Sequence, residues 1–105
     1  VLINLIGNAA DAMREAPQRR LRLGAREVGG MVELHVCDSG SGLPEAVRAR
    51  LFEPFFSTKA EGGGLGLGLA ISRDIAREAG GELEADNAPG GGARFTLRLP
   101  RPPAA

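Results

Sequence analysis

Apolar residues recur along this chain with two different periods, and each change of period marks a new element. Over residues 1 to 14 the apolar positions are spaced three, four and seven apart, which predicts one amphipathic helix that ends before Pro17. From 20 to 28 the alternate residues 21, 23 and 25 are apolar, and from 31 to 37 the residues 32, 34 and 36 repeat that period of two. These two stretches predict strands joined by a tight turn at the glycine pair between them.

The second half of the chain repeats the order of a helix followed by a hairpin. Residues 44 to 51 predict a short helix that starts at a proline, and residues 67 to 79 predict a longer one. The expected apolar face of the longer helix consists of Leu67, Ile71 and Ile75. Alternation then predicts a second hairpin, in which residues 83 to 85 pair with residues 95 to 99.

This order of elements predicts an α+β fold, a two-layer sandwich with a mainly antiparallel sheet and helices on one face. Residues 1 to 100 fit one domain, and residues 101 to 105 are expected to form a disordered tail. Val1 already lies in helical rhythm, with no capping residue ahead of it. We therefore interpret the chain as N-terminally truncated, a fragment that begins within or just before a helix.

Composition narrows the partners of this chain without identifying them. Its 105 residues carry 13 basic and 13 acidic side chains, so no overall charge draws it towards nucleic acid or an anionic membrane. A single cysteine excludes an internal disulfide and any paired-cysteine metal or redox motif. No apolar run approaches the roughly 20 residues of a membrane span, and no secretory leader opens the chain. The cytoplasm is the expected compartment of this domain because the chain has no pair of cysteines for a disulfide.

Three polar residues of the first predicted helix lie on one narrow stripe. Asn4, Asn8 and Asp11 are spaced four and three apart, which places them along the border of the apolar face. Amide and carboxylate oxygens are ligands that Mg²⁺ accepts, and a Mg²⁺ ion bound to a nucleotide needs only one or two of them from the protein. The alternative is a solvated polar edge, which many surface helices have.

Asp38 has the parity of the apolar residues in the second predicted strand, so its side chain is expected to point inward. A buried carboxylate needs hydrogen-bond donors, because burial of an unpaired charge is costly. Either a backbone turn supplies these donors or a ligand amine does, such as the amino group of adenine. The sequence around Asp38 leaves both possibilities open.

Five glycines fall within residues 62 to 68 and lead directly into a predicted helix. The backbone N–H groups at a helix start lack partners and the helix dipole is positive there, so a phosphate chain can bind. Lys59, the only lysine, either reaches that phosphate or remains a solvated loop residue. The glycines fit neither a P-loop nor a dinucleotide-binding turn, because the required lysine and the preceding strand are missing. The segment therefore predicts a nucleotide site of another kind.

Two further features allow more than one interpretation. Residues 52 to 56 hold three of the four phenylalanines, which either anchor a long loop to the core or dock a partner. His35 lies on the outward parity of its strand, so we expect a surface residue and not a catalytic one.

Four motifs in fixed order resemble those of one protein family. They are NLIGNA at 4–9, DSGSGL at 38–43, FEPFF at 52–56 and GLGLGL at 64–69, and they resemble the N, G1, F and G2 boxes of the ATP-binding domain of sensor histidine kinases. The surrounding sequence is similar to the nitrogen-regulation and dicarboxylate-sensor branch. The resemblance implies the Bergerat fold of the GHKL superfamily, an α/β sandwich that holds ATP between its helices and a flexible lid. It also implies strands ahead of the first helix that this chain lacks.

The resemblance assigns roles to the first two boxes. Asn8 would coordinate Mg²⁺, and Asn4 would support the phosphates. Asp38 would accept a hydrogen bond from the adenine amino group, while Gly40 and Gly42 would let the backbone pass close to the base.

The lid and the glycine-rich segment would hold the phosphates. Lys59 would approach them from the lid, and backbone N–H groups would bind them at the helix start. The residues of this second group are Gly64, Gly66, Leu67 and Gly68. Asp11 stands where many relatives carry a lysine, so a hydrogen-bonding role in the nucleotide site is expected for it.

Asn4 also bears on the reaction that the resemblance implies. Relatives that hydrolyse ATP, such as gyrase, carry a glutamate at this helix position, and an amide cannot take the proton of water. The implied reaction is transfer of the γ-phosphoryl group of ATP to a histidine on a separate helical dimerisation domain, with a response regulator downstream. The parent protein is expected to be a homodimer, and anchoring in the inner membrane is left open. A serine kinase of the anti-sigma-factor type and a nucleotide-binding regulatory module without phosphotransfer stay as alternatives.

Overall fold

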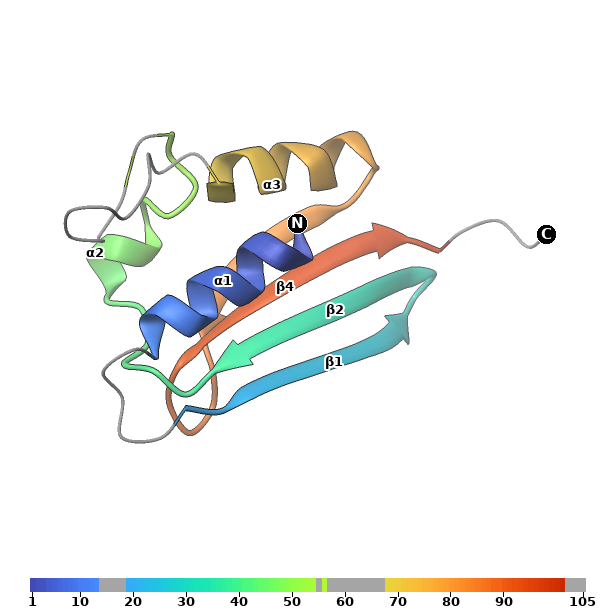
Figure 1. Cartoon of the computed structure of the whole chain (residues 1–105). Coiled ribbons are helices and arrows are strands. Elements are labelled where there is room, and N and C mark those ends of the chain that lie inside the picture. Colours follow the sequence, from blue (N-terminus) through green and yellow to red (C-terminus); the bar gives the residue numbers. More distant parts are fainter. Residues whose placement is uncertain (14–18, 55, 57–67, 102–105) are drawn as a thin grey trace.

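The computed structural model describes residues 1–13, 19–54, 56 and 68–101, without the side chains of residues 11 and 12 (Figure 1). Both predicted hairpins and the three predicted helices are present. None of the helices in these ranges is long and apolar enough to cross a membrane. The elements in chain order are α1 (Leu2–Ala12), β1 (Leu21–Val28), β2 (Met31–Asp38), α2 (Glu45–Arg48), α3 (Gly68–Glu78), β3 (Glu82–Asn87) and β4 (Ala93–Pro100).

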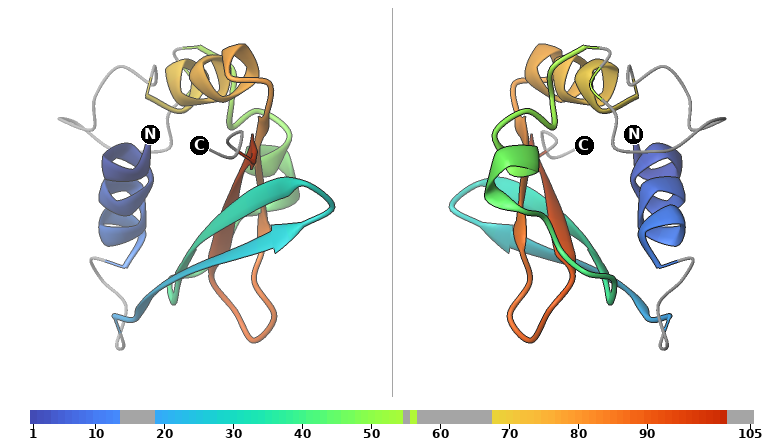
Figure 2. Two further views of the ribbon diagram at one scale, coloured as in Figure 1. Left: turned by 90° about the vertical axis from the view of Figure 1, so that its right-hand side faces the viewer. Right: turned by 90° about the vertical axis from the view of Figure 1, so that its left-hand side faces the viewer.

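The strands form one antiparallel sheet in the order β1-β2-β4-β3. The second hairpin has the predicted pairing, with Leu83 opposite Leu97 and Ala85 opposite Phe95. Figure 2 shows α1 and α3 on the same side of this sheet, which gives the molecule two layers. The predicted α+β sandwich with helices on one face is therefore confirmed.

The core lies between α1 and the central strands. Leu5, Ala9 and Met13 recur every fourth residue along α1 and are at most 6% exposed. Leu5 belongs to the same buried cluster as Val36 on β2 and Phe95 on β4. The period that predicted the helix thus also predicted which of its faces is buried.

The buried face of α3 differs from the predicted one. Ile71 and Ile75, which we expected in the core, are 52% and 49% exposed, whereas Ser72 and Ala76 are buried. Small side chains let a helix lie close to its neighbours, and the larger isoleucines then point outward. Leu67, the third residue of the predicted face, lies outside the described residues.

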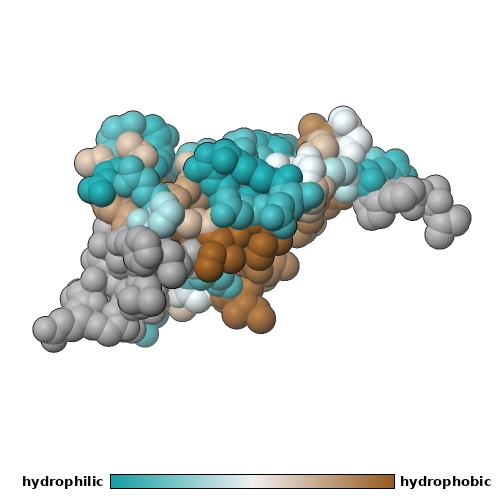
Figure 3. All heavy atoms as spheres, turned by 90° about the horizontal axis from the view of Figure 1, so that it is seen from above, coloured by the Kyte–Doolittle hydropathy of each residue, from teal (hydrophilic) through white to brown (hydrophobic). Residues whose placement is uncertain are grey.

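Apolar side chains are also exposed on α1 and on β1. Leu2 and Ile3 of α1 are 42% and 89% exposed, and Figure 3 shows an apolar area beside the polar surface of α3. On β1, Leu23 is 60% exposed although it lies opposite the buried Val36. The reason is that α1 packs over β2 and leaves the same face of β1 uncovered.

The far face of the sheet carries a charged network centred on Glu33. This residue has the outward parity expected from the sequence, yet it is only 5% exposed. Arg26 and Arg98 lie directly opposite it on the two neighbouring strands, and their Nε atoms donate to its carboxylate at 2.8 Å and 2.6 Å. Two residues further along β2, on the same face, His35 forms a hydrogen bond of 3.2 Å with Thr96 of β4. Arginine side chains therefore bury a carboxylate on a face that none of the described helices covers.

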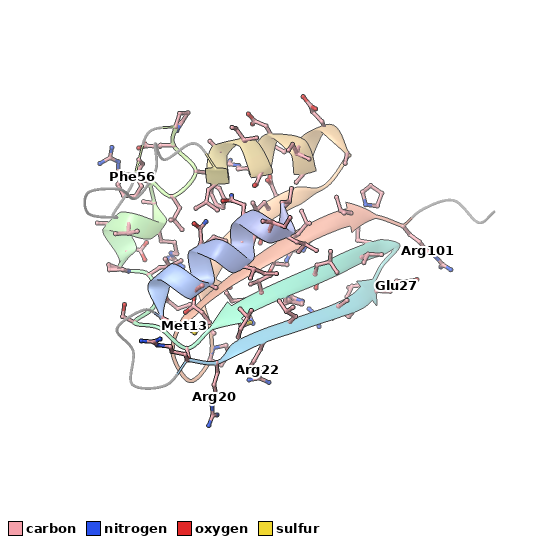
Figure 4. The ribbon with its side chains drawn as sticks, viewed as in Figure 1. Met13, Arg20, Arg22, Glu27, Phe56 and Arg101 are labelled. Atoms are coloured by element: carbon pink, nitrogen blue, oxygen red, sulfur yellow. The ribbon has the colours of Figure 1, made fainter. Side chains whose placement is uncertain are left out.

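The C-terminal end of the described chain is tied to the first hairpin. The backbone N–H of Arg101 donates to the carbonyl of Gly30 at 2.9 Å, and its guanidinium group pairs with Glu27 at 3.0 Å (Figure 4). The sequence assigned Arg101 to the tail, but these bonds fix it to the sheet. Residues 102–105 lie outside the described residues.

The Glu33 network predicts a specific acid sensitivity. The hydrogen bond from Arg98, together with that from Arg26, lowers the pKa of Glu33 from 4.5 to about 2. Its stabilising effect is therefore present above pH 4.5 and is lost as the pH falls towards 2. Over this range, unfolding of the wild type should take up about one more proton than unfolding of Glu33→Gln. Denaturant unfolding at several pH values measures this difference, and equal pH slopes for the two proteins would refute it.

Candidate functional site

Asp38 ends β2 with its carboxylate directed into the layer between sheet and helices. Only 6% of the residue is exposed, which confirms the inward orientation predicted from parity. Its Oδ1 atom accepts hydrogen bonds from the backbone N–H of Gly40 at 2.9 Å and of Ala93 at 3.1 Å. Both recorded bonds end on Oδ1, so Oδ2 receives none from the described part of the chain. A turn donor and a neighbouring strand thus orient the carboxylate and leave one oxygen for a ligand.

The approach of the second hairpin to Asp38 requires a glycine. Gly92 has φ +83°, and a Cβ atom there would lie 1.9 Å from the carbonyl oxygen of Asp38. No side chain fits at that distance, so this glycine allows Ala93 to reach the carboxylate. The sequence indicated only a loop at residues 89 to 92, and it gave no sign of this contact.

The loop that follows β2 is held at both ends. At its start, the backbone N–H and the hydroxyl group of Ser39 donate to the sulfur of Met13, both at 3.3 Å. Figure 4 shows Met13 at the end of α1, beside the end of β2. At the other end, Asn87 bonds to the backbone of Leu43 through both atoms of its amide. Sequence reasoning missed Asn87, since the contact joins residues that are far apart in the chain.

The polar stripe of α1 meets the start of α3. Asn4 donates from Nδ2 to the hydroxyl oxygen of Ser72 at 3.1 Å. A Cβ atom on Gly68 would lie 2.6 Å from Oδ1 of Asn4, so a larger residue at the start of α3 would displace the Asn4 side chain from this position. The structure therefore brings together the first and the last of the four motifs, as the predicted site requires.

The other members of the stripe are placed less completely. Asn8 is half-buried and lies one turn beyond Asn4, towards the end of α1 that contacts the loop after β2. Asp11 belongs to α1, but its side chain is not described. Four other predicted site residues lie outside the described residues, namely Lys59, Gly64, Gly66 and Leu67.

Arginines lie over two of the phenylalanines in the segment before α3. Phe52 packs against the core cluster, and the guanidinium group of Arg73 lies 5.0 Å from the centre of its ring. Arg50 is placed in the same way over Phe56, at 4.7 Å. Phe52 thus supports the anchoring interpretation of this segment.

The inward aspartate at the end of β2, the asparagines along α1 and the glycine at the start of α3 lie where the resemblance to the ATP-binding domain of sensor kinases predicts them. Comparison with known families agrees with this class. The model of the family described as histidine kinase-, DNA gyrase B- and HSP90-like ATPases matches residues 1–103. The chain belongs to this family.

Individual relatives narrow the match to sensor histidine kinases. The two-component sensor PprA of Pseudomonas aeruginosa is 52% identical over an alignment of 106 positions, which covers 95% of this chain and 11% of that protein. The C4-dicarboxylate transport sensor protein DctS of Rhodobacter capsulatus is 44% identical over 97% of this chain and 16% of its own length. The nitrogen regulation protein NtrY of Azorhizobium caulinodans is 41% identical over 98% of this chain and 14% of its own length. The chain thus spans less than a fifth of these three relatives.

Solved structures agree with this assignment. The catalytic domain of histidine kinase ThkA has a TM-score of 0.81 and 33% sequence identity, over 95% of this chain and 63% of that one. Full-length ShkA in complex with AMPPNP has a TM-score of 0.83 and 34% identity, over 99% of this chain and 21% of that one. The chain therefore corresponds to the catalytic domain of sensor histidine kinases.

The contact at Gly92 can be tested against a matched glycine. Gly90 has nearly the same φ, +84°, but a Cβ atom there meets nothing within 4 Å. Gly90→Ala should lower the free energy of unfolding by about 1 to 2 kcal/mol through backbone strain alone. Gly92→Ala should lower it by more than about 3 kcal/mol, because the carbonyl of Asp38 must also move. Denaturant unfolding compares the two variants, and an equal loss would show that the close approach is unimportant.

Proposed function

We propose that this domain binds Mg-ATP and positions its γ-phosphoryl group for transfer to a histidine on a separate helical dimerisation domain of the same protein. The observation that carries the proposal is the buried Asp38 carboxylate, whose Oδ1 is satisfied by Gly40 and Ala93. A carboxylate oriented in this way, with its second oxygen unused by the described residues, is an acceptor prepared for a ligand N–H.

The base that fits this acceptor is adenine. Its exocyclic amino group donates a hydrogen bond, whereas guanine presents a carbonyl oxygen at the same place. An oxygen facing the charged carboxylate would leave both acceptors without a donor. With the 6-position of the base facing Asp38, the carboxylate would therefore favour ATP over GTP. Gly42, with φ +84° in the adjoining loop, would let the backbone pass close to the base, as the family resemblance implies.

The phosphates would lie towards the start of α3. Gly68 begins this helix against Asn4, so the free N–H groups of its first turn are close to the polar stripe of α1. Lys59 and the backbone around Gly64, Gly66 and Leu67 would add positive charge and further donors, as the family resemblance implies. The base and the triphosphate would thus contact opposite ends of α1.

Asn8 lies between these two ends and is our proposed ligand for Mg²⁺. Within the described residues, no three histidine, cysteine, aspartate or glutamate side chains gather as a metal site. One amide oxygen suits an ion that takes most of its ligands from phosphate and water oxygens, so the donors present fit a Mg²⁺ ion that arrives with ATP. When bound, such an ion would neutralise charge that develops on the phosphates. Asp11 would support this region by hydrogen bonding.

In the proposed reaction, a histidine nitrogen of the dimerisation domain forms a bond to the γ-phosphorus. The bond from that phosphorus to the β,γ-bridging oxygen breaks, and ADP leaves with the bond's electron pair. Asn4 has no basic atom to take a proton from water, so hydrolysis should be slow. We propose a response regulator as the next acceptor and a homodimeric parent, in line with the two-component sensors among the relatives. Membrane anchoring of the parent belongs to the same proposal.

The reaction can be tested with ATP labelled at the γ-phosphate. The chain is incubated with the helical domain of its parent protein, with and without the histidine of that domain. We expect acid-labile label on the intact helical domain, since phosphohistidine is unstable in acid, and little release of free phosphate. Acid-stable label would indicate a serine kinase. Binding of ATP without any transfer would indicate a regulatory module.

The role of Asp38 can be tested with an isosteric change. In Asp38→Asn the oxygen can still accept from Gly40 and Ala93, but the amide now turns a donor towards the amino group of adenine. Affinity for ATP should fall by about 1.5 to 3 kcal/mol, the usual range for a hydrogen bond to a charged group. Asp86→Asn, on the far face of the sheet, is the control. Calorimetric titration measures both, and unchanged affinity in a folded Asp38→Asn protein would refute the assignment.

A further inference from the structure

Asn87 makes two hydrogen bonds to one residue of the loop that follows Asp38. Its Oδ1 accepts from the backbone N–H of Leu43 at 2.6 Å, and its Nδ2 donates to the carbonyl oxygen of Leu43 at 3.1 Å. An antiparallel strand would satisfy the same two backbone groups in the same manner. The amide of Asn87 thus makes the same two hydrogen bonds with Leu43 that a neighbouring strand would make.

The chemistry of this contact requires an amide. The side chain must accept from an N–H group and donate to a carbonyl group at the same time, over a reach of three bonds from the backbone. A carboxylate can make only the first bond. Asn87 is exposed, so burial of apolar surface does not explain why an asparagine stands here.

Asn87 is also linked to Asp38 through the sheet. It lies directly opposite Ala93 in the β3–β4 register, and the N–H of Ala93 donates to Oδ1 of Asp38. Of this facing pair, Ala93 therefore orients the carboxylate of Asp38, and Asn87 holds the loop that follows Asp38. Gly42 completes the contact, because a Cβ atom there would lie 2.8 Å from Oδ1 of Asn87.

We propose that Asn87 is a positioning residue for recognition of the base. Its amide fixes Leu43, and with it the loop from residue 39 to 43, at a set distance from Asp38. The carboxylate and the loop backbone then form two sides of one slot for a planar purine. Asn87 acts through Leu43 and does not touch the nucleotide. This inference rests on the proposed function of the domain, since it assigns the base to that slot.

The proposal predicts a loss that is confined to the base. Without the amide, the loop from 39 to 43 keeps its link to Met13 and the packing of the Leu43 side chain against the core, but loses the two hydrogen bonds that fix the backbone of Leu43. The slot should then fit adenine less well, whereas the contacts to the phosphates lie at the other end of α1 and stay unchanged. Inorganic tripolyphosphate with Mg²⁺ reports on the phosphate contacts alone, because it has no base.

The test uses Asn87→Ala and Asn87→Asp in the full-length protein. Glu84→Ala, which removes another exposed polar side chain of β3, is the matched control. For Asn87→Ala we expect affinity for Mg-ATP to fall by about 5- to 20-fold, in the range of one or two neutral hydrogen bonds. The preference for ATP over GTP should fall as well, while affinity for Mg-tripolyphosphate stays at the wild-type value. Asn87→Asp keeps the acceptor for Leu43 and should recover part of the loss.

Two results would overturn the proposal. The first is wild-type affinity for ATP in Asn87→Ala. The second is an equal loss for ATP and tripolyphosphate together with a lower Tm, which would indicate a merely structural role. Asp38→Asn, measured in the same series, separates this inference from the proposed function. If Asp38→Asn weakens ATP binding and Asn87→Ala does not, only the positioning role fails; if neither does, the adenine site itself is refuted.

Discussion

The site depends on the burial of one carboxylate, that of Asp38, between a sheet and a helix. Such a group is costly to bury unless donors surround it, and here the donors are backbone N–H groups of Gly40 and Ala93. Ala93 can donate only because Gly92, which has no side chain, lets β4 approach the end of β2. The second hairpin, which lies far from Asp38 in the sequence, is therefore as much a part of the proposed base site as the loop next to it.

The two faces of the sheet make separate contributions to this geometry. On the helical face, Leu5 and Val36 hold α1 over β2, so that the asparagine stripe runs from α3 to the loop after Asp38. On the far face, Glu33 joins β1 to β4 through Arg26 and Arg98. This network links three strands, and two of them, β2 and β4, have the register that sets Ala93 beside Asp38. A charged face that contacts no proposed ligand thus helps to place the strand ends that do.

Much of the fold could be predicted from the sequence because hydrophobic period reports directly on burial. The period of α1 predicted the burial of Leu5, and strand parity predicted the inward turn of Asp38. The same reasoning was wrong for α3, where close packing favours Ser72 and Ala76 over the isoleucines. It also missed Asn87, because a side chain that replaces a strand partner leaves no periodic signal. The resemblance to sensor kinases predicted the family correctly, whereas the roles that it assigns to the site residues, including Asn8, Asp38 and Lys59, stay predictions.

The two ends of the site are held by different kinds of contact, and this difference fits the proposed chemistry. The base end is fixed by backbone hydrogen bonds, by paired strands and by the amide of Asn87. Among the described residues, the phosphate end is held by the bond from Asn4 to Ser72 and by the close fit at Gly68. A small shift of α3 along α1 would move the phosphate contacts and leave the base contacts in place. A domain that keeps hold of adenine while the γ-phosphoryl group departs needs this separation, since only one end of its ligand changes charge.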